Sequence, residues 1–187
     1  SGMNFPSSVR KNKDGKTEVN ISDPVESISV GEGVNINLDI PGNITITGDE
    51  NWDGSMNVPQ FELEPSVGPD PSPGFTVSTG KTVEVGSPGT KLSLSQAARI
   101  SIPGEAGKKV GYTHGEEFTD ISTECVEDNQ GWANANLLED GDCHKDVDGD
   151  KVIWTKHFTE FVTYEENEET TSGGGGSVTL CQEGDWE

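Results

Sequence analysis

Residues 17–48, TEVNISDPVESISVGEGVNINLDIPGNITITG, decide the fold class, because apolar and polar residues alternate through them in several short runs. An alternation with a period of two places one face of a strand in a core and the other in solvent. The turn signals Gly31-Glu32-Gly33 and Pro41-Gly42 separate the runs. The same pattern returns in residues 75–102 and 110–121. We therefore predict an all-β domain.

Composition and charge patterning set the expected boundaries. The chain has 187 residues, of which 24 are glycine, 10 are proline and only 29% are hydrophobic, which suits one domain with polar ends. We expect a flexible leader at residues 1–16, a β-sandwich domain at residues 17–165, and an acidic, glycine-rich linker with the start of a further segment at residues 166–187. The predicted architecture is a two-sheet antiparallel β-sandwich of about ten short strands with disordered or extended termini, and closure into a barrel is the alternative.

The net charge of −22 comes from 34 acidic and 12 basic side chains. Phosphate groups are bound by basic side chains, so this excess argues against nucleic acid and against an anionic membrane surface as partners. No apolar run approaches the ~20 residues that a helix needs to cross a bilayer, so we predict no membrane span in this chain. No GxSxG, Walker, HExxH or dinucleotide-binding pattern occurs, and no multiple-turnover enzyme is predicted.

Cysteines and glycosylation sequons indicate an extracellular or cell-surface location. Cys125 and Cys143 lie in a polar segment without the CxxC spacing of a zinc site, so we predict a disulfide between them. Asn20 and Asn43 each begin an Asn-x-Ser/Thr sequon, which is a glycosylation signal in secreted proteins. The partner of Cys181 is left open.

The tripeptide His157-Phe158-Thr159 is the strongest candidate for chemistry. A histidine two residues before a hydroxyl side chain, at a turn between strands, suits one self-inflicted cut of the backbone. Thr159 Oγ would attack the carbonyl carbon of Phe158 while His157 accepts the hydroxyl proton, and water would open the resulting ester. The alternative is structural: His157 is a polar residue at a strand end, Phe158 fills the core, and Thr159 has β propensity.

This segment resembles the proteolysis-site motif of adhesion-receptor GAIN domains, in which a region with Cys, Trp and Cys leads into HLT and an apolar strand. It is also similar to the HFS sites of self-cleaving β domains in nucleoporins and death-domain adaptors. The resemblance implies autoproteolysis between Phe158 and Thr159. The receptor motif has a second cysteine pair before the histidine, where this chain has Ile153 and Thr155. The matching residues are Cys125, Trp132, Cys143, His157, Phe158, Thr159, Phe161 and Val162.

A broader resemblance concerns location rather than chemistry. Residues 100–112, ISIPGEAGKKVGY, and residues 154–165, WTKHFTEFVTYE, followed by a glycine-rich spacer, resemble modules of large archaeal surface proteins. The resemblance implies a β-sandwich that works beside other domains of a surface protein.

The acidic segment 139–150, EDGDCHKDVDGD, is a candidate metal site. Asp146, Asp148 and Asp150 alternate as the oxygen ligands of calcium loops do. The twelfth position counted from Asp146 holds His157 in place of the glutamate of an EF-hand. The alternative is a solvated acidic turn that binds no ion. Ca²⁺ is expected only if these aspartates form a calcium site, and no other cofactor is required.

Together these observations predict a structural or adhesive module of a secreted or cell-surface protein that is able to cleave itself. Its expected partners are other surface-protein domains or copies of itself. One alternative is a calcium- or carbohydrate-binding module, which would expose aromatic side chains among Trp52, Trp132 and Trp154, although Trp52 is also suited to capping the core. Another is a filament or lattice subunit that assembles by strand exchange.

Overall fold

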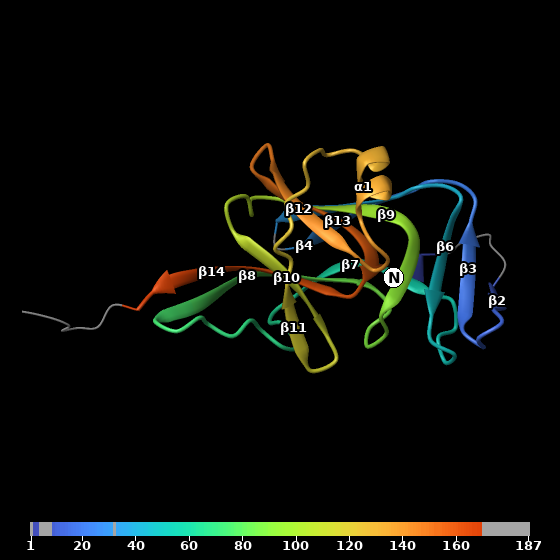
Figure 1. The fold of residues 1–187 in the computed structure, drawn as a ribbon, viewed down its shortest axis with the longest axis horizontal. Coiled ribbons are helices and arrows are strands. Elements are labelled where there is room, and N and C mark those ends of the chain that lie inside the picture. The colour runs from blue at the N-terminus through green and yellow to red at the C-terminus, as the bar shows by residue number, and fades with distance from the viewer. Residues whose placement is uncertain (1, 4–8, 32, 170–187) are drawn as a thin grey trace, which may run out of the picture.

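A computed structural model describes residues 2–3, 9–31 and 33–169, and these residues form an all-β structure with one short helix (Figure 1). The strands make two antiparallel sheets, one of six strands and one of eight. The prediction of an all-β fold with two antiparallel sheets is confirmed. The described residues hold fourteen strands rather than about ten, because several long alternating stretches are divided by turns and two very short strands lie near the N-terminus.

The six strands of the first sheet, in spatial order, are β1 (Gly2–Met3), β7 (Met56–Glu62), β8 (Phe75–Gly86), β14 (Glu160–Glu168), β10 (Lys109–His114) and β11 (Glu117–Asp120). The second sheet runs β12 (Asp142–Val147), β13 (Asp150–Phe158), β9 (Leu92–Ile102), β6 (Ile44–Gly48), β3 (Thr17–Ile21) and β2 (Val9–Lys11). Its remaining two strands are β4 (Val25–Gly31), which pairs with β5 (Val34–Ile40), and β5 also pairs with β9.

The main core lies between the inner faces of the two sheets. Alternate residues of β3 and β6 are buried, as the period of two predicts. Phe158 from the end of β13 and Phe161 from the start of β14 are both fully buried in this core. Full burial of such a side chain contributes about 1.5–3 kcal/mol, so the junction between these two strands is anchored on both sides.

A second, smaller core lies on the outer face of β13 and β9. The helix α1 (Gln130–Asn136) covers this face (Figure 1). Ile153 of β13 therefore packs in the main core, while Val152 and Trp154 point into the smaller one. The members of this smaller core are Ala97, Cys125, Ala133, Leu137, Cys143, Val152 and Trp154.

The predicted disulfide is confirmed, and it closes the loop that carries α1. Cys125 and Cys143 are bonded across a sequence separation of 18 residues, and both are buried. The helix itself was not predicted from the sequence, since its seven residues include glycine and two asparagines, which are weak helix formers. Its start is set by Asn129, whose side chain accepts a hydrogen bond from the backbone N–H of Trp132.

The ends of the domain differ from the predicted boundaries. Residues 9–11, which were expected to belong to a leader, form β2 and pair with β3, where Arg10 forms an ion pair with Glu18. At the other end β14 continues past residue 165 to Glu168 and pairs with β8 as far as Phe75. Figure 1 shows these last residues of β14 and the first of β8 projecting from the body as a two-stranded arm. Of the linker predicted at residues 166–187, residues 170–187, with Cys181, lie outside the described residues, as do residues 4–8 of the predicted leader.

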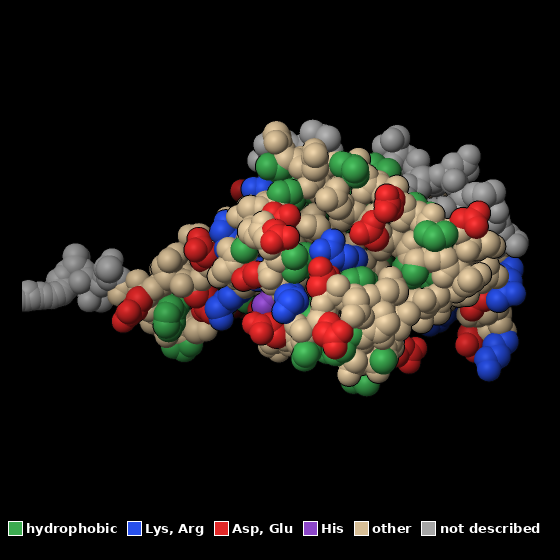
Figure 2. All heavy atoms as spheres, turned by 90° about the horizontal axis from the view of Figure 1, so that it is seen from above, with side chains coloured by type: hydrophobic (Ala, Val, Ile, Leu, Met, Phe, Trp, Pro, Cys, Tyr) green, Lys and Arg blue, Asp and Glu red, His purple; other side chains and the backbone are tan. Residues whose placement is uncertain are grey.

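The surface carries acidic and basic side chains interspersed rather than in one basic patch, over the face drawn in Figure 2. In the described residues no helix is long and apolar enough to cross a membrane.

Candidate functional site

The predicted cleavage site lies where the chain passes from one sheet to the other. β13 belongs to the second sheet and ends at Phe158, while β14 belongs to the first sheet and begins at Glu160. Thr159 alone connects them, in a bend. Its carbonyl accepts a hydrogen bond of 3.1 Å from the backbone N–H of Val85. The Thr159–Glu160 peptide is therefore fastened to β8, directly after the Phe158–Thr159 bond at the crossing between the sheets.

His157, Thr159 and Asp142 form a continuous polar line at this crossing. The hydroxyl of Thr159 lies 3.4 Å from Nδ1 of His157, and Nε2 of the same ring lies 2.5 Å from a carboxylate oxygen of Asp142. An ionised carboxylate only accepts hydrogen bonds, so the contact with Asp142 suits the tautomer of His157 that carries its proton on Nε2. In that tautomer Nδ1 is the acceptor next to the Thr159 hydroxyl, which is the position that a general base needs.

The pairing of β13 with β9 is irregular beside His157. Thr155 pairs with Ala98 and His157 with Ser93, so the extra residues at this register shift belong to β9. On β13 the Thr155 hydroxyl holds the His157 backbone by accepting from its N–H at 3.1 Å and donating to its carbonyl at 2.9 Å.

The imidazole of His157 is fully buried between aromatic rings. Tyr112 contacts it edge to face with the ring centroids 4.4 Å apart, and Phe161 lies 5.6 Å away on the centroid distance. The low dielectric of this enclosed position strengthens the electrostatic coupling between His157 and Asp142. Packing also restricts the ring to one orientation.

The disulfide loop holds Asp142 in place. Asp142 is the first residue of β12 and lies opposite Thr155, and the next residue is the disulfide-bonded Cys143. The Lys156 ammonium donates to the carbonyls of Asn134 and Leu137 at the end of α1. Sequence reasoning found the histidine and the hydroxyl but not Asp142, because nothing in the spacing shows that β12 lies beside the end of β13.

Asp128 fastens the same loop to the sheet. Its carboxylate receives two hydrogen bonds of 2.9 Å from the guanidinium of Arg99 and one of 2.8 Å from the indole N–H of Trp154. The hydrogen bond from Arg99 is the main reason that the pKa of Asp128 lies below its usual value.

The three aspartates of the predicted calcium loop are not brought together. Asp146 forms an ion pair of 2.7 Å with the buried Lys151, and Asp150 accepts from the backbone N–H of Gly104. Asp148 and Gly149 both have positive φ and form the two-residue turn of the β12–β13 hairpin. Within residues 2–3, 9–31 and 33–169 no group of three or more His, Cys, Asp or Glu side chains is arranged to hold a metal ion. The Asp-Gly pair acts here as a hairpin turn.

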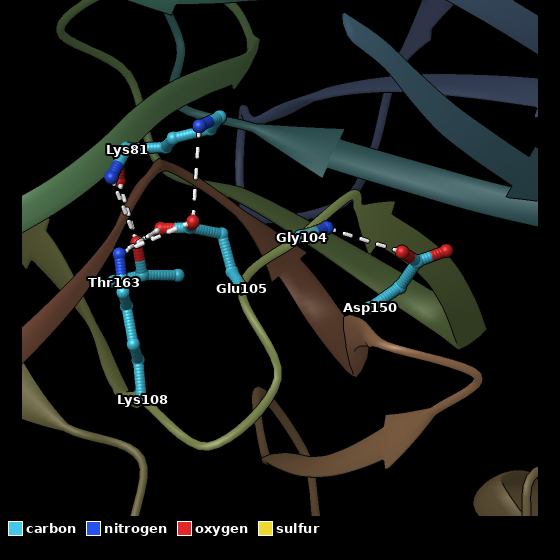
Figure 3. A network of polar contacts seen from close by, with 6 residues as sticks. All are labelled: Lys81, Gly104, Glu105, Lys108, Asp150 and Thr163. Carbon is cyan, nitrogen blue, oxygen red and sulfur yellow. Dashed lines mark hydrogen bonds and ion pairs between the residues drawn. The ribbon is translucent and has the colours of Figure 1, made fainter.

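A buried carboxylate that sequence reasoning missed lies in the loop between β9 and β10. Glu105 is 3% exposed, and Thr163 of β14 donates to it at 2.5 Å. Lys108 approaches the carboxylate at 3.2 Å and Lys81 at 3.7 Å, as Figure 3 shows. This network fastens the loop to the strand that follows the crossing, and it is structural.

The three tryptophans within the described residues do not form an exposed platform for a sugar. Trp52 and Trp154 are 5% and 4% exposed, and Trp132 is partly buried. The indole N–H of Trp52 donates to the carbonyl of Ser55, and its ring belongs to the main core, which confirms its predicted capping role.

The two sequons differ in exposure. Asn43 is exposed, with a positive φ of 56°, at the start of its sequon. Asn20 is half-buried, and its side-chain oxygen accepts a hydrogen bond of 2.7 Å from the Thr45 hydroxyl of the other sequon. Asn43 is therefore the more accessible of the two amides.

Comparison with models of protein families, with curated proteins and with solved structures found no significant match.

Proposed function

We propose that this chain is a structural module of a secreted or cell-surface protein that cuts its own backbone once, between Phe158 and Thr159. The observation that carries the proposal is the buried line from Asp142 through His157 to the Thr159 hydroxyl, at the point where the chain crosses between sheets. The disulfide between Cys125 and Cys143 supports export, since such bonds persist in oxidising compartments.

The chemistry requires no group from outside the chain for its first step. Nδ1 of His157 takes the hydroxyl proton as Thr159 Oγ attacks the carbonyl carbon of Phe158. The carbon–nitrogen bond then breaks, the nitrogen of Thr159 receives the proton from His157, and an ester joins Phe158 to the Thr159 oxygen. Asp142 stabilises the imidazolium that exists between the two proton transfers. Water afterwards converts the ester into a Phe158 carboxylate and a free Thr159 hydroxyl.

The two products of the cut stay together in the fold. β14 follows the cleaved bond, and it pairs with β8 on one side and β10 on the other. Phe161 of β14 is fully buried in the main core. A cleaved chain therefore keeps its shape until it is denatured, which suits a surface module that releases one part under load.

A denaturing gel of wild-type protein and three threonine variants tests the proposal. Wild type is expected to give two fragments, Thr159→Ala one full-length band, and Thr159→Ser two fragments, because serine keeps the hydroxyl. Thr79→Ala is the matched control, since Thr79 is an exposed strand threonine of β8 and its loss leaves cleavage unchanged. A single full-length band for folded wild-type protein refutes the proposal.

The arm of β8 and β14 favours a second candidate, a lattice or filament subunit. β10 pairs with β14 only as far as Tyr164, so residues 165–168 of β14 have β8 as their one strand partner among the described strands. An uncovered strand edge of this kind accepts a strand from another chain. Sedimentation over a range of concentrations tests it: assembly that is lost in Glu168→Pro, whose backbone N–H faces the uncovered edge, supports the candidate, and a monomer throughout rejects it.

A further inference from the structure

A small cavity lies directly beside the crossing between β13 and β14. Its volume is about 150 Å³, and Thr159 itself lines it, together with Ser66, Glu84, Thr90, His114 and Glu160. A water molecule takes roughly 30 Å³ in the liquid, so the cavity has room for several. Polar side chains from five separate segments face it, which makes it suited to holding ordered water next to Thr159.

Two carboxyl groups face this cavity side by side. Glu84 of β8 and Glu160 of β14 are directly opposite each other in the antiparallel pair, where side chains on one face lie close together. The Glu160 carboxylate is fixed by hydrogen bonds from the backbone N–H and the hydroxyl of Ser66, at 2.8 and 3.1 Å. Ser66 thus binds Glu160 and not Glu84, so of the two carboxyl groups Glu84 is the one available to a water molecule in the cavity.

The surroundings of Glu84 make it a stronger base than an ordinary glutamate. Partial burial raises its pKa, and the neighbouring carboxylates of Glu160 and Glu62 raise it further. His114, which is exposed, is the third titratable side chain that lines the cavity, after Glu84 and Glu160. A carboxylate with a raised pKa is effective at removing a proton from water at neutral pH.

We infer that this cavity supplies the water that opens the ester at Thr159, and that Glu84 accepts the proton of that water. The inference rests on the proposed self-cleavage. As the water oxygen bonds to the Phe158 carbonyl carbon, one water proton passes to Glu84. The bond from that carbon to Thr159 Oγ then breaks, and Oγ takes a proton back from Glu84, which leaves a Phe158 carboxylic acid and restores the hydroxyl. Water is the one co-reactant: its oxygen and one hydrogen end in the Phe158 carboxylic acid, and its other hydrogen ends on the Thr159 hydroxyl.

The test compares wild type, Glu84→Gln and Glu165→Gln as purified full-length proteins, each with and without neutral hydroxylamine. Glu165 is the matched control because it is an exposed glutamate of β14 that neither lines the cavity nor shifts the pKa of Glu84. Hydroxylamine is a strong nucleophile that cleaves an ester without a general base, and it marks Phe158 as a hydroxamate that mass spectrometry separates from a carboxylate.

We expect wild type and Glu165→Gln to be cut by water, with a carboxylate at Phe158. Glu84→Gln is expected to be cut by water at least about tenfold more slowly, because loss of a general base costs on that order or more. Hydroxylamine is expected to cut it fully and leave the hydroxamate, which also shows that the variant folds and forms the ester.

Two results overturn the inference while the proposed self-cleavage stands. In one, Glu84→Gln is cut by water as fast as wild type. In the other, it is cut neither by water nor by hydroxylamine while wild type is cut, which places Glu84 in folding or in ester formation. If no protein is cut under either condition, the proposed self-cleavage itself fails, and the inference fails with it.

Discussion

Replacing the buried Glu105 by alanine is expected to destabilise the fold by about 3 kcal/mol. The carboxylate is 3% exposed and receives three partners, Thr163, Lys108 and Lys81 (Figure 3). Hydrogen bonds to a charged group contribute about 1.5–3 kcal/mol, and removing one member of a buried ion pair costs about 3–5 kcal/mol. The two lysines are about a quarter exposed and are rehydrated in the variant, so the lower part of that range applies.

Urea denaturation at neutral pH measures this change. Glu105→Ala should lower the midpoint without changing the slope, because the surface exposed on unfolding is the same. Glu105→Gln should cost less, since an amide oxygen still accepts from Thr163. Glu64→Ala is the control, because Glu64 is exposed in the loop before β8. A change below about 0.5 kcal/mol for Glu105→Ala, in the range of ordinary surface substitutions, refutes the reasoning.

Three further stability predictions follow from the site and its surroundings. Replacing both Cys125 and Cys143 by alanine should cost about 3 kcal/mol, from the entropy of the freed loop of 18 residues. It should also slow cleavage, because Asp142 lies in this loop next to Cys143; unchanged unfolding and cleavage contradict the prediction. Asp128→Asn should cost about 1.5 kcal/mol at neutral pH. The pKa of Asp128 in the folded state lies below the unfolded value of 3.8, so the ionised carboxylate stabilises the fold above that value, and this stabilisation is lost as the pH falls through the folded pKa. The loss of stability in Asp128→Asn should therefore shrink at low pH, and urea titrations that give the same loss at every pH contradict the prediction. Gly48→Ala should lower the free energy of unfolding by about 2 kcal/mol, because the added methyl group overlaps the Trp52 ring. Thermal unfolding measures this change, and an unchanged midpoint temperature contradicts the prediction.

Local patterns in the sequence were sufficient for most of the fold. The alternation in residues 17–48 predicted strands whose inward residues are buried in β3, β5 and β6. The disulfide was predicted from the absence of metal-type spacing. Both predictions depend on residues near one another in the sequence, where periodicity and spacing carry the information.

The missed features depend on contacts between distant segments. The helix α1 is too short to show a period, and it is stabilised by packing on β9 and by the disulfide rather than by its own residues. Asp142 reaches His157 only because β12 pairs with β13, and Glu105 meets Thr163 across 58 positions of the chain. The motif at residues 157–159 therefore indicated the candidate site, while the residues that complete it became visible only in three dimensions.

The intact mass of the wild-type protein, measured after denaturation without reducing agent, tests the central claim most directly. Self-cleavage predicts two masses, one ending at Phe158 with a carboxylate and one beginning at Thr159 with a free amine. The disulfide between Cys125 and Cys143 lies wholly within the first fragment, so it does not join the two. One mass for the uncut chain, from protein shown to be folded, contradicts the account.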